Sequence, residues 1–177
     1  MTDGQNTDDR QQCRSIVRDH YPSVYRFLLH ITRDEGLAED LTQETFAAAW
    51  QKFNTFEHRS DAGTWLCRIA YRKFIDQVRK RQTDAKLTEN LKSEKRSEPE
   101  TQNPMDRLLA DERSRQLYQA VQTLDENGRA LIILHYLQNR SFSQMAEILD
   151  QPVGSIKWRV NQVLSRLRDL MEERKPL

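Results

Sequence analysis

The stretch "SFSQMAEILDQPVGSIKWRV", residues 141–160, contains two short helical patterns with a break between them. Ser141 and Gln144 have the spacing of a capping box, which predicts that the first helix begins directly after Ser141. Pro152 is tolerated in the first turn of a helix, because the N–H that proline lacks has no helical partner there. Pro152 therefore indicates the start of a second helix after a turn of three or four residues.

The second helix has an apolar face and a polar face on opposite sides. Successive helical residues are about 100° apart, which places Trp158 about 200° from Ile156 and at the centre of the polar face. The predicted core stripe comprises Ile156, Val160, Val163, Leu164 and Leu167. The polar face comprises Gly154, Trp158, Asn161, Gln162 and Ser165, with Lys157 and Arg159 at its edges. This pattern predicts a helix-turn-helix, whose second helix enters the major groove of DNA.

The side chains of the polar face suit contact with bases and phosphates. Asn and Gln can hydrogen-bond the adenine edge, and Lys and Arg can contact guanine or phosphate. The alternative is a surface helix that faces only solvent, and an exposed Trp158 could also contact a protein. The chemistry of this face therefore favours DNA binding.

The apolar periodicity of the whole chain predicts an all-α protein of two small helical domains joined by a flexible linker. Residues 1–10 are polar and predicted to be disordered, and residues 173–177 form a short tail. A three-helix domain is predicted over 11–83, with Asp34 as an N-cap and with fraying after Arg81. A four-helix domain is predicted over 104–172, with helices at about 104–123, 126–137, 142–149 and 153–172.

The predicted linker, residues 84–103, has the sequence "DAKLTENLKSEKRSEPETQN". It is crowded with charge and contains two leucines and Pro99, so it cannot bury a core of its own. Asn103 and Pro104 then resemble an N-cap followed by proline at the first helical position. Asp125 can cap the next helix.

Charge is separated along the chain, although 28 basic residues nearly balance 27 acidic ones. Residues 34–50 hold five acids and no base, and residues 65–83 hold six bases and one acid. The bases of the second segment predict a helix edge suited to a phosphate backbone: Arg68, Arg72, Lys73, Arg79 and Lys80. Trp65 and Tyr71 add stacking surfaces for unpaired bases. A basic helix can also be only a solvated face.

Enzymes and metalloproteins are disfavoured by the motifs that the chain lacks. His58, Ser60 and Asp61 lie in one loop, where adjacent side chains do not make a nucleophile, base and orienting group. No glycine-rich phosphate loop and no metal-ligand spacing occurs, so neither a catalytic residue nor a cofactor is expected. The longest apolar run, 130–137, is too short to span a membrane. Cys13 and Cys67 favour reduced thiols in a cytoplasmic protein.

Three segments, taken together, resemble a known family. "AEDLTQETFAAAWQKF" and "GTWLCRIAYRKFIDQVRK", followed by the linker and "SFSQMAEILDQPVGSIKWRVNQVLSRLR", are similar to bacterial RNA polymerase sigma factors of the extracytoplasmic-function (ECF) type. The resemblance covers about 15–83 as region 2 and 105–172 as region 4. It implies an alternative sigma factor in the bacterial cytoplasm that binds core RNA polymerase and promoter DNA. Many members also have an anti-sigma partner.

The resemblance assigns three surfaces to this chain. Region 2 is expected to bind the clamp helices of the polymerase β′ subunit through Asp40, Gln43, Glu44 and Trp50. It is expected to recognise and melt the −10 promoter element through the 54–61 loop and Arg68, Arg72, Lys73, Arg79 and Lys80. Region 4 is expected to lie on the β flap and to read the −35 element through Ser155, Lys157, Trp158, Asn161 and Gln162, with Ser143 and Gln144 near phosphates.

Three positions depart from the family pattern. Trp158 stands where members usually have a small residue, Arg72 stands where asparagine is frequent, and the turn has Asp150 and Gln151 where glycine and an apolar residue are common. The alternative to a sigma factor is a dimeric helix-turn-helix regulator that does not engage core polymerase. A protein-interaction module without DNA contact is a third hypothesis.

Overall fold

The structure, a computed structural model, describes residues 3–53, 56, 61–89 and 112–173, and all regular elements within them are helices. The chain divides into two compact units, Met1–Thr101 and Gln102–Leu177. The all-α fold of two helical domains that the sequence predicts is confirmed. None of the described helices is long and apolar enough to cross a membrane.

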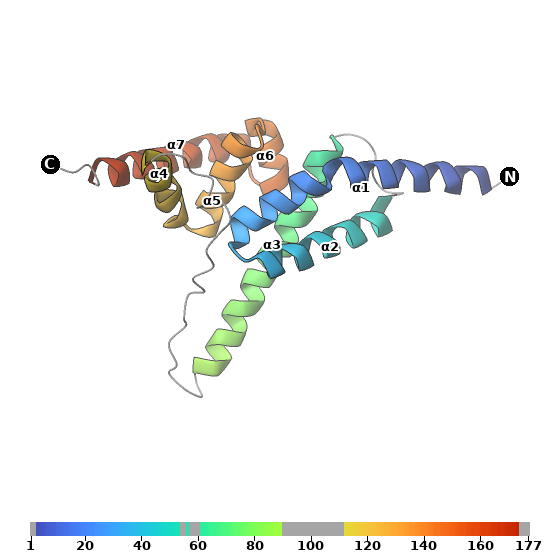
Figure 1. Cartoon of the computed structure of the whole chain (residues 1–177), viewed down its shortest axis with the longest axis horizontal. Helices are drawn as coiled ribbons and strands as arrows, with labels where there is room; N and C mark the ends of the chain where they lie inside the picture. The colour runs from blue at the N-terminus through green and yellow to red at the C-terminus, as the bar shows by residue number, and fades with distance from the viewer. Residues whose placement is uncertain (1–2, 54–55, 57–60, 90–111, 174–177) are drawn as a thin grey trace. The chain divides into compact units, whose positions relative to one another are not determined.

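The first unit is a bundle of three helices, α1 (Asp3–Thr32), α2 (Glu35–Lys52) and α3 (Ala62–Glu89), each packed on the other two (Figure 1). Its core comes from all three helices, because each supplies apolar residues at three- and four-residue spacings. The largest fully buried side chains of this unit are Val24, Phe27, Leu28, Ile31, Thr42 and Leu66. The buried hydroxyls of Thr42 and Thr45 donate to the carbonyl oxygens one turn earlier, at 2.6 and 2.7 Å.

Side-chain caps set the starts of α2 and α3. Arg33 has a left-handed backbone, with φ of 62°, and lies between α1 and α2. The Asp34 carboxylate then accepts from the Leu37 N–H at 3.0 Å, which confirms the predicted N-cap. Asp61 accepts from the Thr64 N–H at 3.0 Å in the same way. Each cap satisfies one of the N–H groups that a helix start leaves without a partner.

Two predicted ends of the first unit are wrong. α1 begins at Asp3 rather than at Gln11, so the opening segment predicted to be disordered is helical from Asp3 onward. α3 continues past Arg81 to Glu89, so residues 84–89 belong to a helix and not to the linker. Apolar periodicity stops at both predicted ends, but polar residues such as Gln, Arg, Lys and Glu also propagate a helix well. The rest of the predicted linker lies outside the described residues.

The second unit consists of α4 (Glu112–Gln122), α5 (Glu126–Ile132), a π-helical turn (Ile133–Leu137), α6 (Phe142–Leu149) and α7 (Val153–Glu173). α7 packs against α4, α5 and α6, and so organises the unit. One core cluster contains Ala120, Leu124, Ile132 and Leu167, with Val163 and Leu170 among the residues packed on it. The helix predicted over 126–137 therefore changes to π geometry in its last five residues.

Asp125 confirms its predicted role as the N-cap of α5. Its carboxylate accepts from the Gly128 N–H at 3.0 Å. A Cβ on Gly128 would lie 2.7 Å from that carboxylate oxygen and 3.3 Å from Val163, so a side chain there would displace the cap. The predicted cap at Asn103 and Pro104 lies outside the described residues.

His30, near the end of α1, is expected to make the first unit less stable in mild acid. Burial, and then the nearby Arg26 guanidinium, lower the pKa of His30 from its ordinary 6.5. Above pH 6.5 the imidazole is neutral whether the unit is folded or not. Below that pH the unfolded chain protonates first, so stability falls from pH 6.5 toward the lower pKa of the folded unit.

Urea unfolding of the wild type and of His30→Gln between pH 7.5 and 5.5 checks this prediction. The wild-type midpoint should fall with pH more steeply than that of the variant. His20→Gln controls for the loss of an imidazole elsewhere on α1. Equal slopes for the wild type and His30→Gln would show that His30 does not produce the dependence.

Candidate nucleic-acid and protein interfaces

The helix-turn-helix is built from α6, a short turn and α7. The predicted capping box is present: the Ser141 N–H donates to the Gln144 side chain at 2.9 Å, and the Gln144 N–H donates to the Ser141 hydroxyl at 3.2 Å. Asp150 ends α6 in the left-handed region, with φ of 56°, where glycine is usual. Pro152 lies directly before α7 rather than in its first turn, and its carbonyl oxygen accepts from the Ile156 N–H at 3.1 Å.

The two faces of α7 agree with the pattern read from the sequence. Ile156, Val160 and Leu167 are buried, and Val163 and Leu164 are half-buried. On the opposite side, Trp158 is 63% exposed. All five α7 residues assigned to the −35 element are exposed: Ser155, Lys157, Trp158, Asn161 and Gln162. The fold therefore brings these side chains onto the outer side of one helix, although their contact with DNA stays a prediction.

The two residues of α6 assigned to phosphates differ in their surroundings. Ser143 is exposed. Gln144 is half-buried, and its side-chain carbonyl oxygen accepts from the Ser141 N–H. The side-chain oxygen of Gln144 therefore caps the start of α6, and only its side-chain NH₂ group can donate to a phosphate.

The cations at the edges of the α7 polar face contact other parts of the unit. The Lys157 ammonium lies 6.0 Å from the centre of the Phe142 ring on α6, a distance suited to a cation–π interaction. The Arg159 guanidinium donates to the Gln151 side chain in the turn at 2.9 Å. The polar Gln151, one of the departures from the family pattern, therefore ties the turn to α7.

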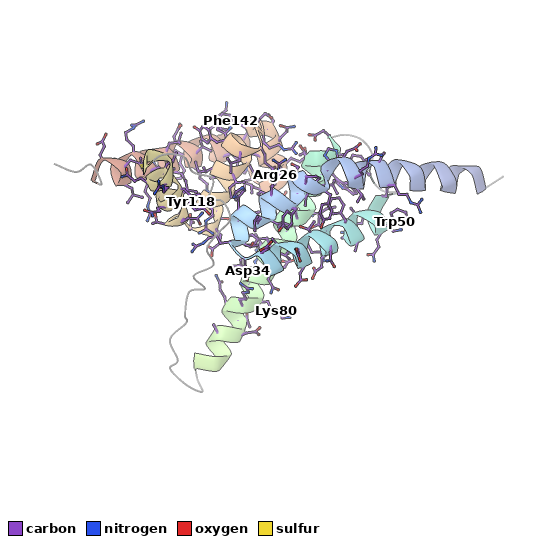
Figure 2. The ribbon with its side chains drawn as sticks, viewed as in Figure 1. Arg26, Asp34, Trp50, Lys80, Tyr118 and Phe142 are labelled. Carbon is purple, nitrogen blue, oxygen red and sulfur yellow. The ribbon has the colours of Figure 1, made fainter. Side chains whose placement is uncertain are left out.

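The acidic residues of α2 form an exposed face on the first unit. Asp40, Gln43, Glu44 and Trp50, all assigned to polymerase binding, are exposed, and Trp50 is labelled in Figure 2 near the end of α2. At about 100° per residue, their positions fall within an arc of about 120°, which places them on one side of the helix. We call this side, together with Glu39, the acidic face.

Tyrosines of α1 lie beside α2, a feature that the sequence pattern did not predict. Tyr21 stacks on Phe46 of α2 with ring centres 5.5 Å apart, and on Tyr25 at 6.5 Å. The pKa of Tyr25 is raised by burial and then by the carboxylates of Glu35 and Glu39. Tyr21 itself is 39% exposed. Its i, i+4 spacing to Tyr25 is the only sequence signal for this pair.

The basic residues of α3 divide into exposed and half-buried groups. Of the five assigned to the −10 element, Arg72, Arg79 and Lys80 are exposed, whereas Arg68 and Lys73 are half-buried. Arg79 lies 3.9 Å from Asp76 on the same helix, and both side chains are exposed. Among these five, the three exposed cations are therefore the best placed for a phosphate backbone.

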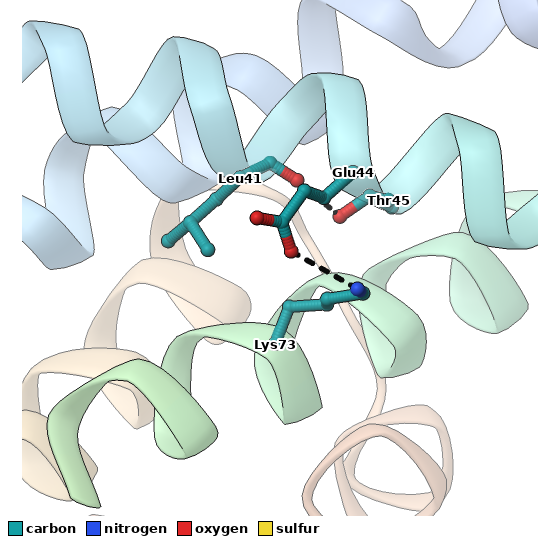
Figure 3. Close-up of polar contacts among 4 residues, drawn as sticks. All are labelled: Leu41, Glu44, Thr45 and Lys73. Carbon is teal, nitrogen blue, oxygen red and sulfur yellow. Dashed lines mark hydrogen bonds and ion pairs between the residues drawn. The ribbon is translucent and has the colours of Figure 1, made fainter. Parts of the chain in front are cut away.

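The Lys73 ammonium binds the Glu44 carboxylate of α2 at 3.0 Å (Figure 3). This contact joins a residue assigned to the −10 element with one assigned to polymerase. An ion pair this exposed contributes roughly 0–1 kcal/mol, so a stronger partner can displace either group. The two expected surfaces of the first unit therefore meet at this pair instead of lying on separate sides.

The aromatic residues of α3 are less exposed to unpaired bases than predicted. Tyr71 is buried in the core, so its predicted role in stacking on unpaired bases is wrong. Trp65 is half-buried and stacks on Phe56 with ring centres 4.6 Å apart. Of the 54–61 loop, only Phe56 and Asp61 are described, so most of that predicted surface lies outside the described residues.

Comparison with known proteins identifies both units. The family model for Sigma-70 region 2 matches residues 16–83, and the model for Sigma-70 region 4 matches residues 114–167. The chain is 31% identical over 160 residues to the ECF RNA polymerase sigma factor SigX of Bacillus subtilis (strain 168). The aligned residues cover 86% of this chain and 80% of SigX. It is also 31% identical over 155 residues to the ECF RNA polymerase sigma factor SigM of the same organism, and the aligned residues cover 88% of this chain and 92% of SigM.

Solved structures agree with these relatives. The sigma factor RpoE of Bartonella quintana, solved in complex with the anti-sigma factor NepR, matches with a TM-score of 0.71 and 26% identity over 92% of this chain and 98% of that one. CnrH, solved with the cytosolic domain of CnrY, shares the fold with a TM-score of 0.67 and 19% identity. The resemblance read from the sequence is confirmed: the chain belongs to the ECF family of RNA polymerase sigma factors, which direct the polymerase to promoters.

Proposed function

We propose that the two units divide the work of this sigma factor. The first unit binds core RNA polymerase through the acidic face of α2, and recognises and melts the −10 element through the cations of α3. The second unit lies on the β flap and reads the −35 element with α7. One observation carries this division. In the first unit the residues assigned to polymerase are exposed on one side of α2, and in the second unit the α7 residues assigned to the −35 element are exposed on one side of α7.

Electrostatics supports this arrangement in the first unit. The acidic face attracts a basic polymerase surface, and the exposed Arg72, Arg79 and Lys80 attract phosphates. Because the acids lie on α2 and the cations lie on α3, the first unit can bind polymerase and promoter DNA at the same time. The polymerase catalyses RNA synthesis, so the sigma factor itself supplies no catalytic group and needs no cofactor.

Two further assignments follow from the family. The protein acts in the bacterial cytoplasm, because polymerase and promoters are there. An anti-sigma factor that covers the polymerase- or promoter-binding surfaces would hold it inactive, and the sigma factor RpoE of Bartonella quintana has been solved in complex with such a partner, NepR. A dimeric regulator that does not engage polymerase has no support among the relatives.

Reconstituted transcription tests the proposed function. Purified protein is added to core RNA polymerase and a library of promoter fragments, and transcripts are mapped by sequencing. Initiation that requires the protein, at promoters that share −10 and −35 elements, is expected. Failure to bind core polymerase, together with binding of the free protein as a dimer to palindromic DNA, would contradict the proposal.

A further inference from the structure

Trp158 is the most exposed of the large hydrophobic side chains in the described part of the chain, at 63%. Single exposed apolar residues are common on protein surfaces, so the exposure alone carries no conclusion. The position is more informative. Trp158 projects from the outer side of α7, opposite the buried Ile156 and Val160, and Ser155, Asn161 and Gln162 are exposed beside it.

The neighbours of Trp158 leave its indole uncovered. Within the described residues the indole makes no hydrogen bond or ring contact, and the side chains on either side of it are directed elsewhere. Lys157 lies over Phe142, and Arg159 binds Gln151. Neither adjacent cation therefore lies over the indole.

Gly154, one turn before Trp158, leaves open surface on the same side of α7. A Cβ added there would meet nothing within 4 Å. Helical side chains lean toward the preceding turn, so the surface beside Gly154 is where the indole can lie flat. A glycine in this place also lets the backbone approach another molecule closely.

We propose that Trp158 selects thymine in the −35 element by packing its indole against thymine C5-methyl groups. This inference rests on the proposed entry of α7 into the major groove. The base edges there present hydrogen-bond donors and acceptors, and the thymine methyl is their apolar group. The indole offers a large apolar face and one N–H donor. Over other bases it would cover polar groups without pairing most of them, which disfavours those sequences.

The test removes only the methyl groups from the DNA. The −35 element is first selected from a randomised library with the full-length protein bound to core polymerase. Each thymine of the selected element is then replaced by uracil, which pairs in the same way but lacks the C5-methyl group. Wild-type holoenzyme should lose about fourfold in promoter affinity at one or two of these positions, the effect of about one buried methyl group.

Variants of the protein assign that loss to Trp158. Trp158→Ala should bind the thymine and uracil promoters equally, and Trp158→Phe should keep part of the preference. Asn161→Ala is the matched control from the same exposed side: it should weaken binding yet keep the preference for thymine. Gly154→Leu should fold, because the site is open, and should reduce the preference by filling the surface beside the indole.

The outcomes separate this inference from the proposed function. Failure of the protein to drive initiation, or initiation that ignores the −35 element, would overturn the proposed function. Strong dependence on the −35 element without sensitivity to uracil would overturn only the role of Trp158. An equal loss by Trp158→Ala on promoters with a scrambled −35 element would also overturn it, and would make Trp158 a polymerase contact.

Discussion

Reversing charge on the acidic face, by Asp40→Lys together with Glu44→Lys, is expected to weaken binding to core RNA polymerase about 100-fold. Both side chains are exposed on α2, so neither substitution disturbs the core. Each lysine would bring like charges together at an interface proposed to pair acids with bases. Titration of fluorescently labelled protein with core polymerase measures the change. The difference should shrink as salt is raised, because salt screens exposed charges.

Two controls make this result specific. Glu44 also pairs with Lys73, so Glu44→Lys alone breaks a contact within the first unit. Glu44→Lys with Lys73→Glu keeps an ion pair at that place while reversing the charge on α2, and should still bind polymerase weakly. Asp169→Lys with Glu172→Lys makes the same charge change on the exposed surface of α7 and should bind normally. Equal losses in all three double variants would refute the acidic face as the polymerase surface.

Ile156→Ala is expected to destabilise the second unit by about 2–5 kcal/mol. The side chain of Ile156 is completely buried on the inner side of α7, and its truncation leaves a cavity where α7 packs on the rest of the unit. Hydrogen exchange of α6 and α7 amides measures the loss in the full chain, because it reports each unit separately. Activity at −35-dependent promoters should fall with it.

Trp158→Ala, two positions away on the opposite side of α7, is the matched control. It removes a larger side chain, yet hydrogen exchange should change by no more than about 0.5 kcal/mol, as for other surface substitutions. Its effect should be confined to DNA binding. A loss of stability as large as that of Ile156→Ala would show that the indole is part of the core.

Local features of the fold could be predicted from the sequence with good accuracy. The caps at Asp34, Asp125 and Ser141 involve hydrogen bonds to residues three positions away, so the spacing alone specifies them. The buried stripe of α7 follows from helical periodicity in the same way. Uncapped ends were predicted poorly: α1 begins before Gln11 and α3 passes Arg81, because polar residues extend a helix without an apolar signal.

Contacts between helices were decided by the tertiary structure. Glu44 and Lys73 are 29 residues apart, and their ion pair depends on how α2 and α3 pack. The same holds for Tyr21 on Phe46, for Lys157 over Phe142 and for the burial of Tyr71. The sequence determined which residues of α7 face outward, through helical periodicity. Only the packing of helices on one another decided which of those residues are already engaged and which, like Trp158, are left for a partner.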